Sequence, residues 1–144
     1  MEIAMRKDCT LREEYLMKIW DNYILNDLLK TVPCKMAIYD LRARRLIVNS
    51  DRFYVTDNEL FNILEGMKYP DVLFRDGVTI QNRHYEVRRT DGKNGIYAKD
   101  GEDGCTVCLS VSMLVVSVND HHVKSEVCNE HVMKLGDYFR SLGI

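Results

Sequence analysis

The sequence lacks the features that mark membrane, secreted and nucleic-acid-binding chains. Its longest apolar run is only Met113 to Val116, whereas a membrane-spanning helix needs about 20 apolar residues. The segment from Met1 to Asp8 contains no apolar stretch of the signal-peptide kind. With 20 basic and 22 acidic residues, the formal net charge is −2, which gives no global attraction to nucleic acid or to an anionic membrane. We therefore expect a cytoplasmic protein without a nucleic-acid partner.

Motifs for catalysis and metal binding are missing as well. The chain contains no GxSxG, HExxH, P-loop or GxGxxG pattern. His121 and His122 are adjacent but have no carboxylate or cysteine at a recognised ligand spacing. The cysteine count of five is odd, and without an export signal it indicates reduced thiols. Cys105 and Cys108 fall in a predicted strand, where a three-residue spacing points side chains to opposite faces. We expect no enzyme, no cofactor and no bound metal.

The 144 residues, of which 46% are hydrophobic, suffice for one domain with one core. Residues 1–10 are charged and aperiodic, and we interpret them as a loosely ordered arm that precedes a single domain at 11–144. The pattern Thr10-x-x-Glu13 predicts a capping box, followed by an amphipathic helix to about residue 30. Val32-Pro33 ends that helix.

The rest of the chain alternates short apolar runs with turn residues. Two runs joined by a polar turn predict a β-hairpin at 35–39 and 45–49. A second capping box at Thr56 and Glu59 begins a helix that we expect to end near Gly66. An apolar stripe at 125–142 predicts a last helix. Five strands with glycine-containing turns lie between the two helices, and we place them at 78–81, 84–89, 95–99, 105–110 and 113–119. This order predicts an α+β fold, with an antiparallel sheet and the terminal helices packed on one face.

Aromatic residues gather on the two terminal helices. Trp20 and Tyr23 are three residues apart on the first helix, and Tyr138 and Phe139 lie near the end of the last. If these helices pack side by side, their rings form a ridge suited to a polyproline II ligand, whose free carbonyls accept from Tyr O–H and Trp N–H groups. The alternative is that all of these rings belong to an interhelical core.

The same residues resemble the profilin family. The pattern Trp20-x-x-Tyr23-Ile24 is similar to the family's N-terminal signature, and the stretch from Cys128-Asn129 to Leu135-Gly136-Asp137-Tyr138 is similar to its C-terminal one. The order of elements matches from about Trp20 to Ile144, and the pattern is that of a divergent member. The resemblance implies the fold above with a short helix on the other sheet face. It also implies an adaptor, not an enzyme, which binds monomeric actin, proline-rich segments and phosphoinositides and regulates actin assembly.

The resemblance assigns residues to each binding site. Ile47 stands where the family has a further aromatic residue, which predicts a weakened proline site. The proline-rich site comprises Trp20, Tyr23, Tyr138, Phe139 and Ile144. The actin site comprises Phe74, Arg88, Lys99, Lys124 and Asn129. The phosphoinositide site comprises Arg42, Arg44, Arg45, Arg88 and Arg89.

Departures from the family pattern concentrate on the actin side. The turn from Tyr97 to Asp100 keeps a single base, and Glu130 and Lys134 are reversed in sign relative to vertebrate members. Because like charges across an interface cost several kcal/mol, we expect weak or species-selective actin binding by a monomeric protein. Two alternatives remain: a profilin-fold module that binds proline-rich or phosphoinositide ligands without actin, and an unrelated longin-like scaffold.

Overall fold

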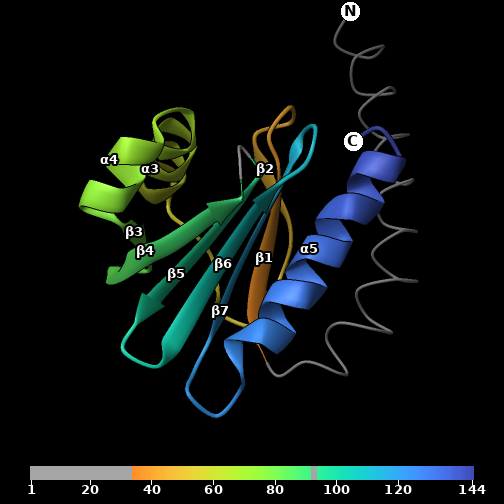
Figure 1. The fold of residues 1–144 in the computed structure, drawn as a ribbon. Coiled ribbons are helices and arrows are strands. Elements are labelled where there is room, and N and C mark those ends of the chain that lie inside the picture. The colour runs from red at the N-terminus through yellow and green to blue at the C-terminus, as the bar shows by residue number, and fades with distance from the viewer. Residues whose placement is uncertain (1–33, 92–93) are drawn as a thin grey trace, which may run out of the picture. The chain divides into compact units, whose positions relative to one another are not determined.

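The computed structural model describes residues 34–91 and 94–144. In this part of the chain, an antiparallel sheet is flanked by helices on both faces (Figure 1). The predicted arm, the predicted first helix, Trp20 and Tyr23 lie outside the described residues. The α+β fold class is confirmed. The strands are β1 (Lys35–Asp40), β2 (Arg45–Asn49), β3 (Val78–Ile80), β4 (Arg83–Asp91), β5 (Gly95–Asp100), β6 (Asp103–Leu109) and β7 (Met113–Asn119). The helices are α3 (Asp57–Lys68), α4 (Pro70–Asp76) and α5 (Ser125–Ser141).

The strands form one sheet in the order β2-β1-β7-β6-β5-β4-β3. Strands β3 to β7 follow one another as a meander, as the short connections predict. The hairpin of β1 and β2 then joins this meander through β1 and β7, which pair from Lys35↔Val118 to Asp40↔Met113. This long-range pairing sets the start of β1 beside the end of β7.

One face of the sheet holds a core beneath α3 and α4. Alternate residues of the strands point to this face, which is the period-two pattern of a half-buried strand. Its side chains pack against both short helices and the segment that leads into α3. The most buried members are Ala37, Phe53, Ile63, Val78, Ile80, Ile96, Cys105, Val107, Leu114 and Val116.

The capping box at the start of α3 is confirmed, and it also fixes a distant turn. The Thr56 hydroxyl accepts from the Glu59 N–H at 3.2 Å, and the Glu59 carboxylate accepts from the Thr56 N–H at 3.2 Å. The same carboxylate accepts from the N–H groups of Gln81 at 3.0 Å and Asn82 at 2.9 Å. Gln81 and Asn82 have φ values of 50° and 66°, so one carboxylate holds two left-handed turn residues against the helix N-terminus.

The predicted end of this helix at Gly66 is wrong, because α3 continues to Lys68 and α4 begins almost at once. Gly66 lies inside the helix where α4 crosses closely: a Cβ there would lie 2.5 Å from Leu73 Cδ2. The glycine thus serves close packing rather than helix termination. Pro70 occupies the first turn of α4, where its missing N–H costs nothing.

The opposite face of β6 and β7 is covered by α5. The predicted apolar stripe is confirmed, since Cys128, Val132, Leu135 and Phe139 are fully buried. A Cβ at Gly136 would lie 2.4 Å from Cys108 Sγ, so the helix backbone sits directly on β6. Among the described residues, no helix has the length and apolar character to cross a bilayer.

Candidate functional site

The last turns of α5 present one aromatic ring and bury its neighbour. Tyr138 is half-buried, whereas Phe139 is fully buried, with the ring centroids 6.3 Å apart. Ile144 is 8% exposed, and its carbonyl oxygen accepts from Ser110 Oγ at 2.8 Å and from the Ser112 N–H at 3.2 Å. The end of the chain is therefore fastened to the β6–β7 turn. Of the residues predicted for proline-rich ligands, Tyr138 is the described one that offers a ring surface.

A second candidate surface follows one row across three strands. Arg89 pairs with Tyr97, and Tyr97 pairs with Thr106, on β4, β5 and β6 respectively. The Arg89 guanidinium lies 4.2 Å from the centroid of the Tyr97 ring, which is a cation–π contact. The Thr106 hydroxyl donates to Asn129 Oδ1 on α5. The row therefore runs from β4 across β5 and β6 to Asn129 on α5.

Arg88 reaches its position because β4 contains a bulge. The register shifts between Val87 and Arg89, so that Arg88 is an extra residue without a cross-strand partner. Without the shift, Arg89 would share the core face of Val87. With it, Arg89 reaches the Tyr97 ring, and Arg88 is exposed beside it.

Lys99 and Lys124 come to the same end of the sheet. Lys99 is half-buried and pairs with Gly104 on β6, while Lys124 is the exposed N-cap residue of α5. A Cβ at Gly104 would lie 2.7 Å from Ser125 Oγ and 2.6 Å from Asn119 Oδ1. Only glycine lets the helix start this close to β6, and this approach brings the two lysines into one neighbourhood.

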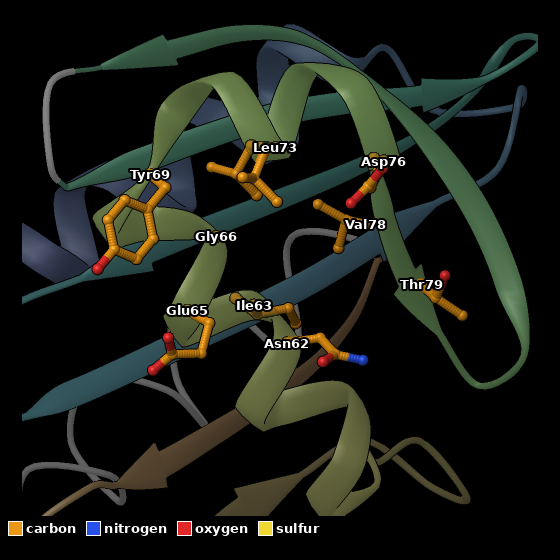
Figure 2. A pocket seen from close by; sticks show the side chains of 11 residues that line it. Asn62, Ile63, Glu65, Gly66, Tyr69, Leu73, Asp76, Val78 and Thr79 are labelled. Atoms are coloured by element: carbon orange, nitrogen blue, oxygen red, sulfur yellow. The ribbon is translucent and has the colours of Figure 1, made fainter.

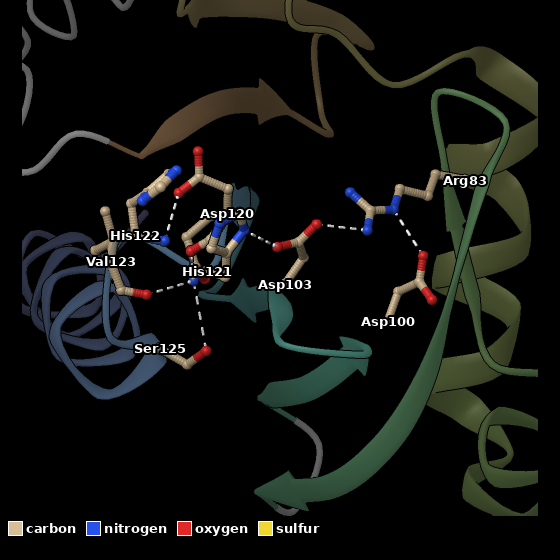
Figure 3. Close-up of polar contacts among 9 residues, drawn as sticks. Arg83, Asp100, Asp103, Asp120, His121, His122, Val123 and Ser125 are labelled. Atoms are coloured by element: carbon tan, nitrogen blue, oxygen red, sulfur yellow. Dashed lines mark hydrogen bonds and ion pairs between the residues drawn. The ribbon is translucent and has the colours of Figure 1, made fainter.

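Several other charged side chains near this surface form ion pairs with one another (Figure 3). Arg83 donates to Asp100 at 2.8 Å and to Asp103 at 2.6 Å, and His121 Nδ1 lies 3.6 Å from Asp103. The hydrogen bond from Arg83 lowers the pKa of the Asp103 carboxyl. Lys134 and Glu130, the pair of reversed sign, bridge each other at 3.1 Å. By contrast, Arg88, Lys99 and Lys124 make no ion pair within residues 34–91 and 94–144.

Phe74 is placed apart from this row. It lies on α4, on the opposite side of the sheet from α5, and is 48% exposed. The helix α4 contacts β4, the strand that carries Arg88 and Arg89. The predicted actin-site residues thus lie on both faces of the sheet, on α4, β4, β5 and the first turns of α5.

The predicted phosphoinositide residues form two separate groups. Arg42, Arg44 and Arg45 lie at the β1–β2 turn, where Asp40 Oδ1 accepts from the Arg42 N–H at 3.0 Å and Arg44 has a φ of 55°. Arg88 and Arg89 lie on β4. Four strand spacings separate β1 from β4, or about 19 Å along the sheet, so a single headgroup cannot contact both groups.

A pocket of about 430 Å³ lies between α3, α4 and β3 (Figure 2). Its two carboxylates are already paired: Asp76 with Arg75 at 2.9 Å and Glu65 with Lys68 at 3.0 Å. The Asp76 carbonyl oxygen lies 2.8 Å from His84 Nε2. In the described ranges, no group of three or more His, Cys, Asp or Glu side chains could hold a metal ion.

Comparison with known proteins gives a consistent result. The profilin family model matches residues 18–144. Profilin of Drosophila melanogaster is 27% identical over 86% of this chain and 98% of its own length, and profilin-3 of Caenorhabditis elegans is 22% identical over 85% and 97%. Among solved structures, Acanthamoeba castellanii profilin IA has a TM-score of 0.76 at 24% identity, covering 87% of this chain and 99% of its own. Mouse profilin IIa, solved in complex with a double repeat from the FH1 domain of mDia1, has a TM-score of 0.69 at 19% identity over 87% and 99%.

Proposed function

The chain belongs to the profilin family, a family of non-enzymatic actin-binding proteins, and on that basis we propose that it is a monomeric cytoplasmic adaptor for actin and proline-rich segments. The observation that carries the proposal is the extent of the family match, which runs from residue 18 to residue 144 and so includes Trp20, Tyr23 and the whole of α5. The two ligands use different parts of α5. The predicted start of the domain at residue 11 stays a prediction.

The proline-rich ligand binds at the end of α5, through the Tyr138 ring. Support comes from the partial exposure of Tyr138 beside the buried Phe139 and from the FH1 repeat bound to mouse profilin IIa. Phe139 and Ile144 are buried and so offer little surface to the ligand. Trp20 and Tyr23, which the family resemblance adds to this site, lie outside the described residues and stay predictions. An aromatic contact of this kind is worth about 0.5–1.5 kcal/mol beyond its buried area.

Fluorescence of the single tryptophan tests this site. Titration of the full chain with polyproline should change the Trp20 emission in a saturable way, and Tyr138→Ala should weaken the apparent affinity about tenfold. Tyr69→Ala is the matched control, because Tyr69 is a 60% exposed tyrosine at the junction of α3 and α4. A flat titration, or equal losses in both variants, would contradict a proline site at the end of α5.

Monomeric actin binds a surface that comprises β4, β5 and the start of α5. This surface carries three basic side chains, Arg88, Lys99 and Lys124. It also carries the row of contacts from Arg89 to Asn129. Binding is weak or selective for the actin of the same species, because the chain has fewer basic residues here than the family pattern. Pyrene-actin assembly with matched actin tests the site, and Lys99→Glu should abolish any slowing of assembly. Lys68→Glu on α3 is the control, since its exposed pair with Glu65 lies elsewhere. If the Lys99→Glu variant slows actin assembly as much as the native chain does, the actin site does not include Lys99.

Anionic phospholipid headgroups are a further candidate ligand, at the β1–β2 turn. Arg42 and Arg44 are exposed there, and arginine forks suit phosphate oxygens. The β4 pair is less suited, because Arg89 is stacked on Tyr97. The native chain should sediment with phosphoinositide vesicles, whereas an Arg42→Ala/Arg44→Ala variant should stay in the supernatant. Equal amounts of both proteins in the pellet would exclude this turn as the lipid-binding site.

A further inference from the structure

Two cysteines, Cys34 and Cys128, meet on the sheet face that α5 covers. Cys34 directly precedes β1, so it has the same parity as Met36 and points to the sheet face that α5 covers. Cys128 lies in the first turn of α5 and is fully buried. Met36 pairs with Ser117 on β7, which sets the start of β1 beneath that first turn. In Figure 1, β1 and α5 begin at the same end of the sheet.

The two thiols differ in accessibility and in acidity. Cys34 is only partly buried, whereas Cys128 is fully enclosed. The Cys128 thiol donates a hydrogen bond to Cys34, which outweighs the effect of burial and lowers the pKa of Cys34 to about 7. The same contact raises the pKa of Cys128. Cys34 is therefore the nucleophile of the pair, because the thiolate is the reactive form.

The other described cysteines lack this arrangement. Cys105 is fully buried on the α3–α4 face, and burial raises its pKa. Cys108 faces Gly136 and Arg140, and burial raises its pKa as well. Because these two thiols lie on opposite faces of β6, as the sequence predicts, neither can link to the other.

We propose that Cys34 and Cys128 are a peroxide-sensitive dithiol that closes into a disulfide between the start of β1 and the first turn of α5. The Cys34 thiolate attacks one oxygen of hydrogen peroxide; the O–O bond breaks, and hydroxide leaves as water after taking up a proton. The product is Cys34 sulfenic acid. Cys128 sulfur then attacks the Cys34 sulfur and displaces the second water, with the thiol proton going to the leaving oxygen. In sum, two thiols are oxidised and one peroxide is reduced to two waters.

Mass spectrometry of the full chain after peroxide treatment tests the proposal. The native protein should lose two of its five thiols and about 2 Da, with reversal by dithiothreitol. Its peptide map should contain a link between residues 34 and 128. The closed loop is long, so the oxidised form should melt about 5–15 °C higher than the reduced form. The control Cys105→Ala should form the same link.

Cys34→Ser and Cys128→Ser should block the link while the other thiols stay reduced. Because Cys34 is partly exposed, Cys34→Ser is expected to fold, and its circular dichroism and melting in reductant check this. If Cys128→Ser does not fold, Cys34→Ser and the native peptide map decide the question. Three outcomes would overturn the proposal: no link, a link between two chains, or Cys34 converted to sulfinic acid with Cys128 still reduced.

Discussion

Replacing Glu59 by glutamine tests the most connected polar group of the described chain. The Glu59 carboxylate is 8% exposed and accepts from three backbone N–H groups, those of Thr56, Gln81 and Asn82. Glutamine has the same shape, but one carboxylate oxygen becomes an NH₂ group that cannot accept. One charge-assisted bond is then lost, worth about 1.5–3 kcal/mol, and the other two become neutral bonds. We expect the free energy of unfolding to fall by about 3 kcal/mol in Glu59→Gln at pH 7.

The loss should depend on pH in a defined direction. Burial alone would raise the pKa of Glu59, but the N–H donors of Asn82, Thr56 and Gln81 outweigh it and lower the pKa. A group with a depressed folded pKa stabilises the fold above its unfolded pKa of about 4.3. That stabilisation disappears as the pH falls through the folded value. The difference between native protein and Glu59→Gln should therefore be full at pH 7 and shrink below about pH 4.

Urea unfolding at several pH values measures both effects. Glu65→Gln is the matched control, because Glu65 lies on the same helix but only bridges Lys68 at the surface, a contact worth at most about 1 kcal/mol. Its stability should change little at any pH. A loss below about 0.5 kcal/mol for Glu59→Gln, or a loss that stays constant from pH 7 to pH 3, would refute the role assigned to this carboxylate.

Three further predictions concern packing and thiol chemistry. Gly136→Ala should cost about 1–3 kcal/mol in urea unfolding, because its Cβ meets Cys108 Sγ at 2.4 Å, and adding Cys108→Ala should recover at least about 1 kcal/mol. The rate of Cys34 alkylation by iodoacetamide should rise with a midpoint near pH 7, and Cys128→Ala should move that midpoint upward by removing the donor. Tyr39→Phe should cost about 2–3 kcal/mol on thermal unfolding, because the buried hydroxyl both accepts from and donates to the backbone of Val55, at 2.6 and 2.9 Å.

Local signals predicted most of the described elements. The capping box at Thr56 and Glu59, the hairpin and the apolar stripe of α5 each depend on residues close in sequence, and all three are confirmed. The meander follows from glycine turns in the same way. The helix α4 was not predicted, because its seven residues are too few to show a helical period and they begin at Pro70.

Long-range geometry accounts for what the sequence analysis missed at the candidate site. A bulge at Arg88 is invisible in the strand pattern, yet it decides that Arg89 meets Tyr97. The contact between Cys34 and Cys128 requires the pairing of β1 with β7, which joins segments far apart in the chain. The CxxC motif of Cys105 and Cys108 is visible in the sequence, whereas no sequence motif pairs Cys34 with Cys128.

The geometry of α5 separates the two binding sites that we propose. Asn129 and Tyr138 are nine residues apart, and at about 100° per residue they lie on opposite sides of the helix. The rise of 1.5 Å per residue separates them by a further about 14 Å along the axis. Asn129 faces β6 through Thr106, so Tyr138 lies on the other side of the helix. A proline-rich segment on Tyr138 would leave the surface around Asn129 open, and the packing of Val132 and Leu135 between the two residues holds the helix in place. We therefore expect polyproline to leave the actin affinity within about twofold of its value without peptide, because the two surfaces share a helix but no side chain.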